Sequence, residues 1–170
     1  MTPEQIDLVW NNCQKNEILA LDLTTVLQTI SYSIEAKELT YFVSKMLGKS
    51  PSVIISKELD LMLGMGRKTN ATDEALKENQ ARVIEFFWNY LFDASSNDYL
   101  NQSLATKALS ALSELLRLSS VEMIITYFGR FIEKIRASDK SYFCVTATSQ
   151  FLRLFFNKDN VTRASLVDSF

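Results

Sequence analysis

The side chains best suited to nucleophilic chemistry are two thiols, Cys13 and Cys144. A thiol becomes a nucleophile when a nearby base, usually histidine, takes its proton. No histidine occurs among the 170 residues, so Cys–His and Ser–His–Asp catalysis are excluded within this chain. Two widely spaced cysteines are also too few soft ligands for a zinc site. Both lie in apolar helical patterns, which favours free buried thiols over a disulfide.

Carboxylate pairs could supply general acid–base chemistry, and two occur close together in sequence: Glu58 with Asp60, and Glu74 with Glu78. Such chemistry requires an environment that raises the pKa of one acid. Both pairs lie in patterns typical of charged helix faces, so we predict solvated surface groups.

Anion binding is the other chemistry to consider, at the segment LGMGRK, residues 63–68. Two glycines and two cations there could attract an anion. A helix C-terminus whose cations complement the helix dipole is the favoured interpretation. The sequence therefore predicts no catalytic, cofactor-binding or metal-binding residue and no cofactor, and it leaves the partner-binding residues undefined.

Aromatic residues could instead line a peptide groove. Their helical spacing favours a position in the core. The candidates are Trp10, Trp88, Phe128, Phe151 and Phe155.

The composition is that of an ordinary globular protein, with 47% hydrophobic and 22% charged residues. A net charge of −2 and a pI near 5.3 leave no basic footprint for nucleic acid. No run of Lys or Arg suggests an anionic membrane surface, and the apolar run at 83–95 is about half of a membrane span. No signal peptide is recognisable, which predicts an intracellular protein. Only four Gly and two Pro occur, which favours long helices joined by short links.

Capping residues and breakers predict about eight helices. The first starts with Thr2 as its N-cap, Pro3 at the first helical position, and Gln5 closing a capping box with Thr2. The other expected landmarks are a second helix over 17–31, Ser33 as the cap and Gly48 as the end of the third, Pro51 at the start of the fourth, 72–74 at the start of the fifth, Ser119 with Glu122 as the capping box of the seventh, and an eighth between 141 and 157.

Apolar residues at helical spacing predict the buried face of each helix. In the seventh helix, Gly129 costs about 1 kcal/mol relative to Ala, and close packing of another helix or a kink would explain it. The expected inward residues are Ile6, Val9, Trp10 and Cys13 in the first helix, Leu19, Leu23, Val26, Leu27 and Ile30 in the second, Leu39, Phe42, Val43 and Met46 in the third, and Ile55, Leu59 and Met62 in the fourth.

Two consecutive helices, the fifth and the sixth, carry two apolar stripes each. A closed bundle needs one stripe per helix, whereas stacked layers bury a helix from several sides. We therefore expect an all-α fold, an α-solenoid of the armadillo or HEAT kind with about eight antiparallel helices, and keep a closed helical bundle as the alternative. The stripes are Ile84, Phe87, Trp88 and Leu91 with Val83, Phe86 and Tyr90, and Leu104, Ala108, Ala111 and Leu115 with Ala105, Leu109, Leu112 and Leu116.

Three segments, TPEQIDLVW, EALKENQARVIEFFWNYLFDAS and GRFIEKIRASDKS, carry a family resemblance. Together they resemble the non-catalytic helical region of the giant fat-facets-like ubiquitin-specific proteases. The matching motifs are Trp88-Asn89 in a leucine-rich helix and the stretch 131–136 followed by Asp139-Lys140. The resemblance implies a cytoplasmic or nuclear armadillo-like segment, attached to a thiol-dependent deubiquitinase. The family's Cys and His boxes have no counterpart here, so no catalytic residue carries over.

These observations predict that residues 1–170 form a single helical-repeat segment of a much longer protein. We expect it to be non-catalytic and to act as a scaffold or substrate-recruiting segment of a large deubiquitinating enzyme. A freestanding helical-repeat adaptor, unrelated to ubiquitin, is the alternative. The expected partners are other proteins and adjacent repeats of the parent chain, with no nucleic acid and no membrane.

Overall fold

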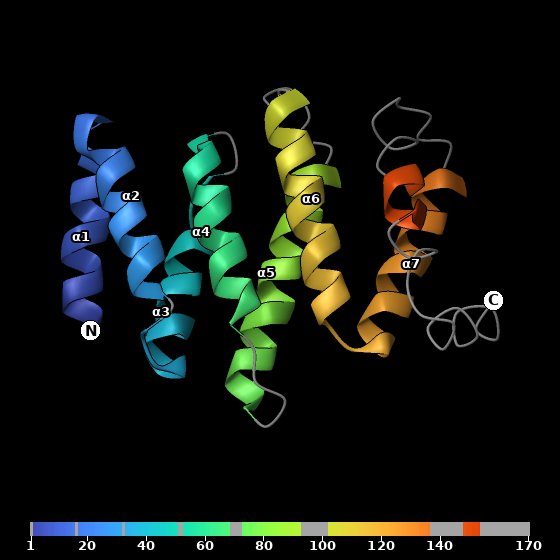
Figure 1. Ribbon diagram of the computed structural model, residues 1–170, viewed down its shortest axis with the longest axis horizontal. Helices are drawn as coiled ribbons and strands as arrows, with labels where there is room; N and C mark the ends of the chain where they lie inside the picture. The colour runs from blue at the N-terminus through green and yellow to red at the C-terminus, as the bar shows by residue number, and fades with distance from the viewer. Residues whose placement is uncertain are drawn as a thin grey trace. The chain divides into compact units, whose positions relative to one another are not determined.

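The computed structural model describes residues 2–15, 17–31, 33–50, 53–68, 73–92, 102–136 and 148–153 (Figure 1). Within these ranges every regular element is helical, which confirms the all-α prediction. No helix among the described residues is long and apolar enough to cross a membrane. The helices are α1 (Pro3–Lys15), α2 (Glu17–Ser31), α3 (Ala36–Leu47), α4 (Ser56–Arg67), α5 (Glu74–Phe92), α6 (Gln102–Leu118) and α7 (Val121–Arg136), with a further helical stretch at 148–153.

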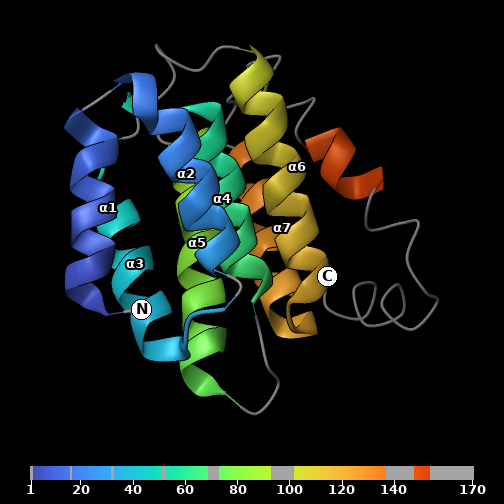
Figure 2. The same ribbon diagram turned by 60° about the vertical axis from the view of Figure 1, so that its left-hand side comes forward.

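The chain divides into two compact units, residues 1–115 and 116–170. In the first unit, contacts join some consecutive helices and also helices two positions apart in the chain. α1 contacts α2 and α3, α2 contacts α4, and α3 and α4 both contact α5 (Figures 1 and 2). The odd-numbered helices α1, α3 and α5 therefore follow one another in one row, and α2 and α4 lie in another.

The start of α1 matches the predicted capping box. The Thr2 N–H donates to Oε1 of Gln5 at 2.9 Å, and the Gln5 N–H reaches Oγ1 of Thr2 at 3.4 Å. Each polar side chain thus satisfies a backbone donor at the open end of the helix.

Three other predicted boundaries are wrong by one to five residues. Ser33 does not cap α3, because its hydroxyl donates back to the Ile30 carbonyl and the N-cap is Glu35. α4 begins at Ser56, well after Pro51, which lies outside the described residues. At α7 the Met123 N–H donates to Oγ of Ser120, so the cap is one residue later than expected.

The end of α3 and the start of α5 lie where the sequence predicts them. Gly48 is the C-cap of α3, in a right-handed conformation with φ −76°. Asp73 caps α5, since its Oδ1 accepts from the Leu76 N–H at 3.2 Å.

Most of the predicted inward residues are buried. The apolar stripe of α3 and both stripes of α5 are each at most 8% exposed. Val26 and Ile55 are corrections, at 46% and 39% exposed. Val26 lies on the solvent side of α2, and Ile55 precedes the first turn of α4 as its N-cap. The side chains of Cys13, Leu19 and Leu23 lie outside the described part of the chain.

The second unit has its own aromatic contact. Phe151 is buried and lies 4.2 Å from Phe131 and 6.4 Å from Phe128, ring centroid to ring centroid. Of the two explanations considered for Gly129, close packing of another helix finds no support, because an added Cβ would meet no described atom within 4 Å.

Candidate functional site

Of the four predicted surface carboxylates, Glu74 and Glu78 are exposed and Asp60 is half-buried. Glu58 is a correction, since it is only 3% exposed. Its carboxylate accepts from Nζ of Lys49 at 2.5 Å and from the Ile55 N–H at 3.0 Å. A charge buried in this way is stable because it is paired and hydrogen-bonded. Glu58 therefore has a structural role at the start of α4.

Three of the five aromatic residues considered for a peptide groove are buried core residues. Trp10 is 8% exposed and meets Phe42 edge-on at 6.1 Å, and Trp88 is 4% exposed. Phe151 is buried and Phe128 is half-buried. Phe155 and Cys144 lie outside the described residues.

The segment LGMGRK forms the C-terminal end of α4, as favoured from the sequence. Lys68, the C-cap, donates from its ammonium group to the carbonyl of Ile34. Gly66 has a role that the sequence did not indicate. A Cβ on it would lie 2.9 Å from the methyl groups of Leu115 in α6 and 3.0 Å from Val83 in α5. The glycine therefore permits three helices to approach one another closely.

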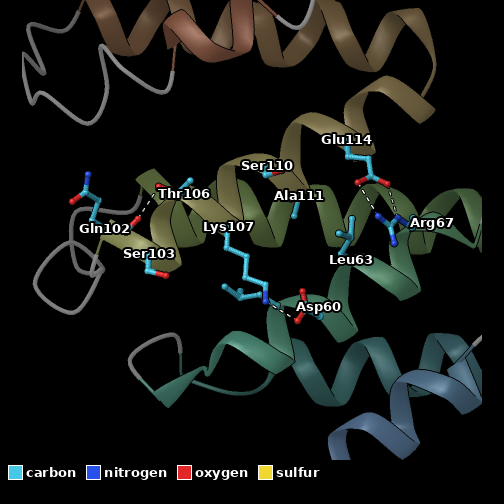
Figure 3. Close-up of a pocket in the computed structure, with 11 residues that line it drawn as sticks. Asp60, Leu63, Arg67, Gln102, Ser103, Thr106, Lys107, Ser110, Ala111 and Glu114 are labelled. Atoms are coloured by element: carbon cyan, nitrogen blue, oxygen red, sulfur yellow. Dashed lines mark hydrogen bonds and ion pairs between the residues drawn. The ribbon is translucent and has the colours of Figure 1, made fainter.

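A surface groove of about 950 Å³ runs between α4 and α6, entirely within the first unit (Figure 3). Leucine and alanine side chains form its apolar floor. Hydroxyl, amide and charged side chains form its polar walls. The lining residues are Leu59, Asp60, Leu63 and Arg67 of α4, and Gln102, Ser103, Thr106, Lys107, Ser110, Ala111 and Glu114 of α6.

Two ion pairs join the walls of this groove, Lys107–Asp60 near its middle and Arg67–Glu114 toward one end (Figure 3). Nζ of Lys107 donates to Oδ2 of Asp60 at 2.6 Å and to Oγ of Ser56 at 2.8 Å. Arg67 donates through Nε and Nη2 to the two carboxylate oxygens of Glu114, at 2.5 and 2.8 Å. The four charged side chains of these pairs are between 32% and 42% exposed, so all of them remain in contact with solvent.

The contact between Ser56 and Lys107 resembles the first requirement of a Ser–Lys nucleophilic pair. The ion pair with Asp60 requires the ammonium form of Lys107. An ammonium has no lone pair with which to accept the serine proton. In this arrangement Lys107 can bind an anionic or carbonyl oxygen, and it cannot activate Ser56.

The described residues include a second polar cluster, between α1 and α3. Asp7 accepts from the Tyr41 hydroxyl at 2.7 Å, and its Oδ1 forms an ion pair with Nζ of Lys45 at 2.9 Å. These two donors, Lys45 first, lower the pKa of Asp7 below its ordinary value of 3.8. The interactions of Lys45 with Asp7, and after that with Tyr41, raise the pKa of Lys45 above 10.5. The cluster stabilises the α1–α3 contact.

Metal binding finds no support in the part of the chain that the structure describes, where no group of three or more His, Cys, Asp or Glu side chains could hold an ion. Comparison with known proteins found no matching family model, no matching curated protein and no matching solved structure. The α4–α6 groove, with hydroxyls, amide and paired charges over an apolar floor, is therefore the candidate site, and its chemistry is that of binding.

Proposed function

We propose that this chain is a non-catalytic helical-repeat segment that recruits other proteins to a large deubiquitinating enzyme of the fat-facets-like kind. The observation that carries the proposal is the order of helix contacts in the first unit. α1 meets α3, α3 meets α5, and α2 meets α4. Helices that pack on the helix two positions further on build an array that extends in one direction, as an α-solenoid of antiparallel helices does.

The burial of α5 supports the same arrangement. Its two apolar stripes are buried, and together they extend round most of the helix. Its polar residues form a narrow seam in which Asn89 is exposed. A helix between two layers needs this double cover, whereas a helix of a closed bundle exposes a wide polar face. Such arrays present a long surface without a deep pocket, which suits protein binding.

The link to ubiquitin rests on the sequence resemblance. Trp88, the aromatic residue of one matching motif, is 4% exposed, and Phe131 of the other is 1% exposed. Buried residues of this kind preserve a fold, so they support common ancestry and do not mark a binding surface. The proposal includes adjacent repeats of the parent chain and other proteins as partners, in the cytoplasm or the nucleus. It assigns no catalysis to this segment.

The test is to delete residues 1–170 from the parent deubiquitinase and compare two substrates. A small fluorogenic ubiquitin substrate needs only the catalytic domain, so its turnover should be unchanged and serves as the internal control. Selected ubiquitinated proteins should be processed more slowly, because they lose their recruiting surface. Equal turnover of every protein substrate would contradict recruitment, and it would favour a freestanding adaptor or a purely structural role.

A further inference from the structure

We propose that α7 binds a second copy of this chain, as an antiparallel pair of α7 helices related by a two-fold axis near the middle of the helix. This contact is independent of the proposed recruiting function. It uses one face of α7 in the second unit, where a partly exposed apolar stripe lies beside two charges, one in the first turn and one in the last.

α7 carries a second apolar stripe next to its buried one. Ile124, Tyr127 and Phe131 form the buried face. At about 3.6 residues per turn, four further aliphatic side chains fall within about 80° of the helix circumference. Two of them are 44% and 47% exposed, and the other two are half-buried. They are Val121 and Ile135, and Ile125 and Ile132. An aliphatic stripe at helical spacing that keeps this much exposure is a face that another helix can cover.

The space beside the stripe is open. Gly129 lies one turn from both Ile125 and Ile132, and a Cβ added to it would meet no described atom within 4 Å. Because glycine has no side chain, the helix is narrow at this point. A second helix can therefore approach the middle of the stripe without displacing a side chain at this position.

The stripe has nearly the same spacing in both directions along α7. Ile125 and Ile132 are equally far from the middle of the helix, and Val121 and Ile135 are so to within one residue. In an antiparallel pair of identical helices, residues at equal distances from the middle lie opposite each other. Ile125 of one copy then meets Ile132 of the other. Val121 meets Ile135 in the same way, and the two-fold axis repeats both contacts.

Charges in the end turns of α7 select the antiparallel orientation and the identical partner. Glu122 and Arg136 are exposed, and neither side chain has a hydrogen bond or ion pair among the described residues. They lie seven residues before and after Gly129, within about 20° of its direction on the helix. In the antiparallel pair Glu122 of each copy meets Arg136 of the other. A parallel pair would bring like charges together at both positions, which is unfavourable.

The first test is the mass of the full chain in solution. A contact between two single helices is smaller than the standard interface of about 1,600 Å², so the dimer should dissociate on dilution. Analytical ultracentrifugation under reducing conditions, which prevent disulfides of Cys13 or Cys144, should show a mass that rises from 19.4 kDa toward twice that value with concentration. A mass of 19.4 kDa at every concentration would overturn the proposal and leave the stripe to a different protein or to a further helix of the array.

Charge reversal tests the orientation. Glu122→Arg should weaken the dimer about tenfold or more, because the new cation meets Arg136 of the other copy. Arg136→Glu should weaken it as much, because the new anion meets Glu122. An equimolar mixture of the two variants should associate as wild type does, since every opposing pair then has unlike charges. Glu78→Arg makes the same charge change at an exposed position of α5 and should leave the dimer unchanged.

The mixture also separates association from folding. A variant that only fails to fold is not rescued by a second variant that fails to fold, and thermal unfolding identifies either case. A wild-type dimer that both reversals leave intact would overturn the α7 contact. A mixture that stays monomeric, or a loss with Glu78→Arg equal to that with Glu122→Arg, would overturn it as well.

Discussion

Lys49 and Glu58 form the most deeply buried of the ion pairs described, with side chains 14% and 4% exposed. Nζ of Lys49 also lies 5.7 Å from the ring centroid of Trp10, so one ammonium connects the end of α3, the start of α4 and α1. Replacing Lys49 by Met should lower the free energy of unfolding by about 3 kcal/mol, because Glu58 would keep a buried charge without a partner. Urea denaturation measures this loss.

The control for Lys49→Met is the double variant Lys49→Met/Glu58→Gln. The glutamine oxygen can still accept from the Ile55 N–H, and it carries no charge. The double variant should recover most of the lost stability. A double variant as unstable as the single one would show that the charge of Glu58 is not the cause.

The Asp7–Lys45 pair predicts a pH dependence at both ends of the scale. The lowered pKa of Asp7 gives a stabilisation that is complete above 3.8 and is lost as pH falls through the folded-state value. The raised pKa of Lys45 gives one that is complete below 10.5 and is lost as pH rises through its folded-state value. The stability difference between wild type and Asp7→Asn should thus be largest between these limits and shrink beyond them. Lys45→Met should show the same profile. A difference that is constant from pH 2 to 12 would contradict it.

Side-chain roles could be predicted where they depend on near neighbours in sequence. The capping residues Thr2 and Gln5 are only three positions apart, and both hydrogen bonds are present. Glu58 was misplaced because its partner Lys49 comes from before the helix, and no helical pattern shows that contact. The groove between α4 and α6 was not predicted for the same reason. In the sequence, Lys107 and Glu114 look like ordinary surface charges, because their partners Asp60 and Arg67 are 47 residues away.

Among whole elements, two of the helical glycines, Gly66 in α4 and Gly129 in α7, make opposite predictions. At Gly66 an added methyl would press on Leu115, which is fully buried, and overpacking costs about 1–3 kcal/mol. The helix propensity of Ala returns about 1 kcal/mol. We expect Gly66→Ala to lose about 1 kcal/mol net.

Gly129→Ala is the matched control, because no described atom lies within 4 Å of the added methyl. It should gain about 0.5–1 kcal/mol from helix propensity. Chemical denaturation of both variants decides the matter, and a stabilised Gly66→Ala would show that the α4–α6 contact is looser than the distances indicate.

Helix positions followed from the sequence better than helix contacts. α2 spans Glu17–Ser31 as predicted, because acidic and polar residues mark its ends. α5 was recognised as buried on two sides because its stripes are visible in thirteen residues of sequence. The close approach at Gly66 has no such signal, because a glycine near the end of a helix equally predicts that the helix ends there.

For the molecule as a whole, composition and periodicity were sufficient to predict an all-α chain. The order in which helices pack depends on shape complementarity between distant faces, and a list of amphipathic helices fits a bundle or an array equally well. The contacts of α1 with α3 and of α2 with α4 are the observation that favours the array.

The most direct test of the array is to extend the chain with the residues that would follow it in the proposed parent protein. In a stacked array each added repeat covers an apolar face of the one before it, so the melting temperature of the helices described should rise. A Gly/Ser tail of the same length serves as the control and should change nothing. We predict a clear rise in the melting temperature with the natural extension alone. An unchanged value would mean a self-contained bundle and would contradict the helical-repeat account.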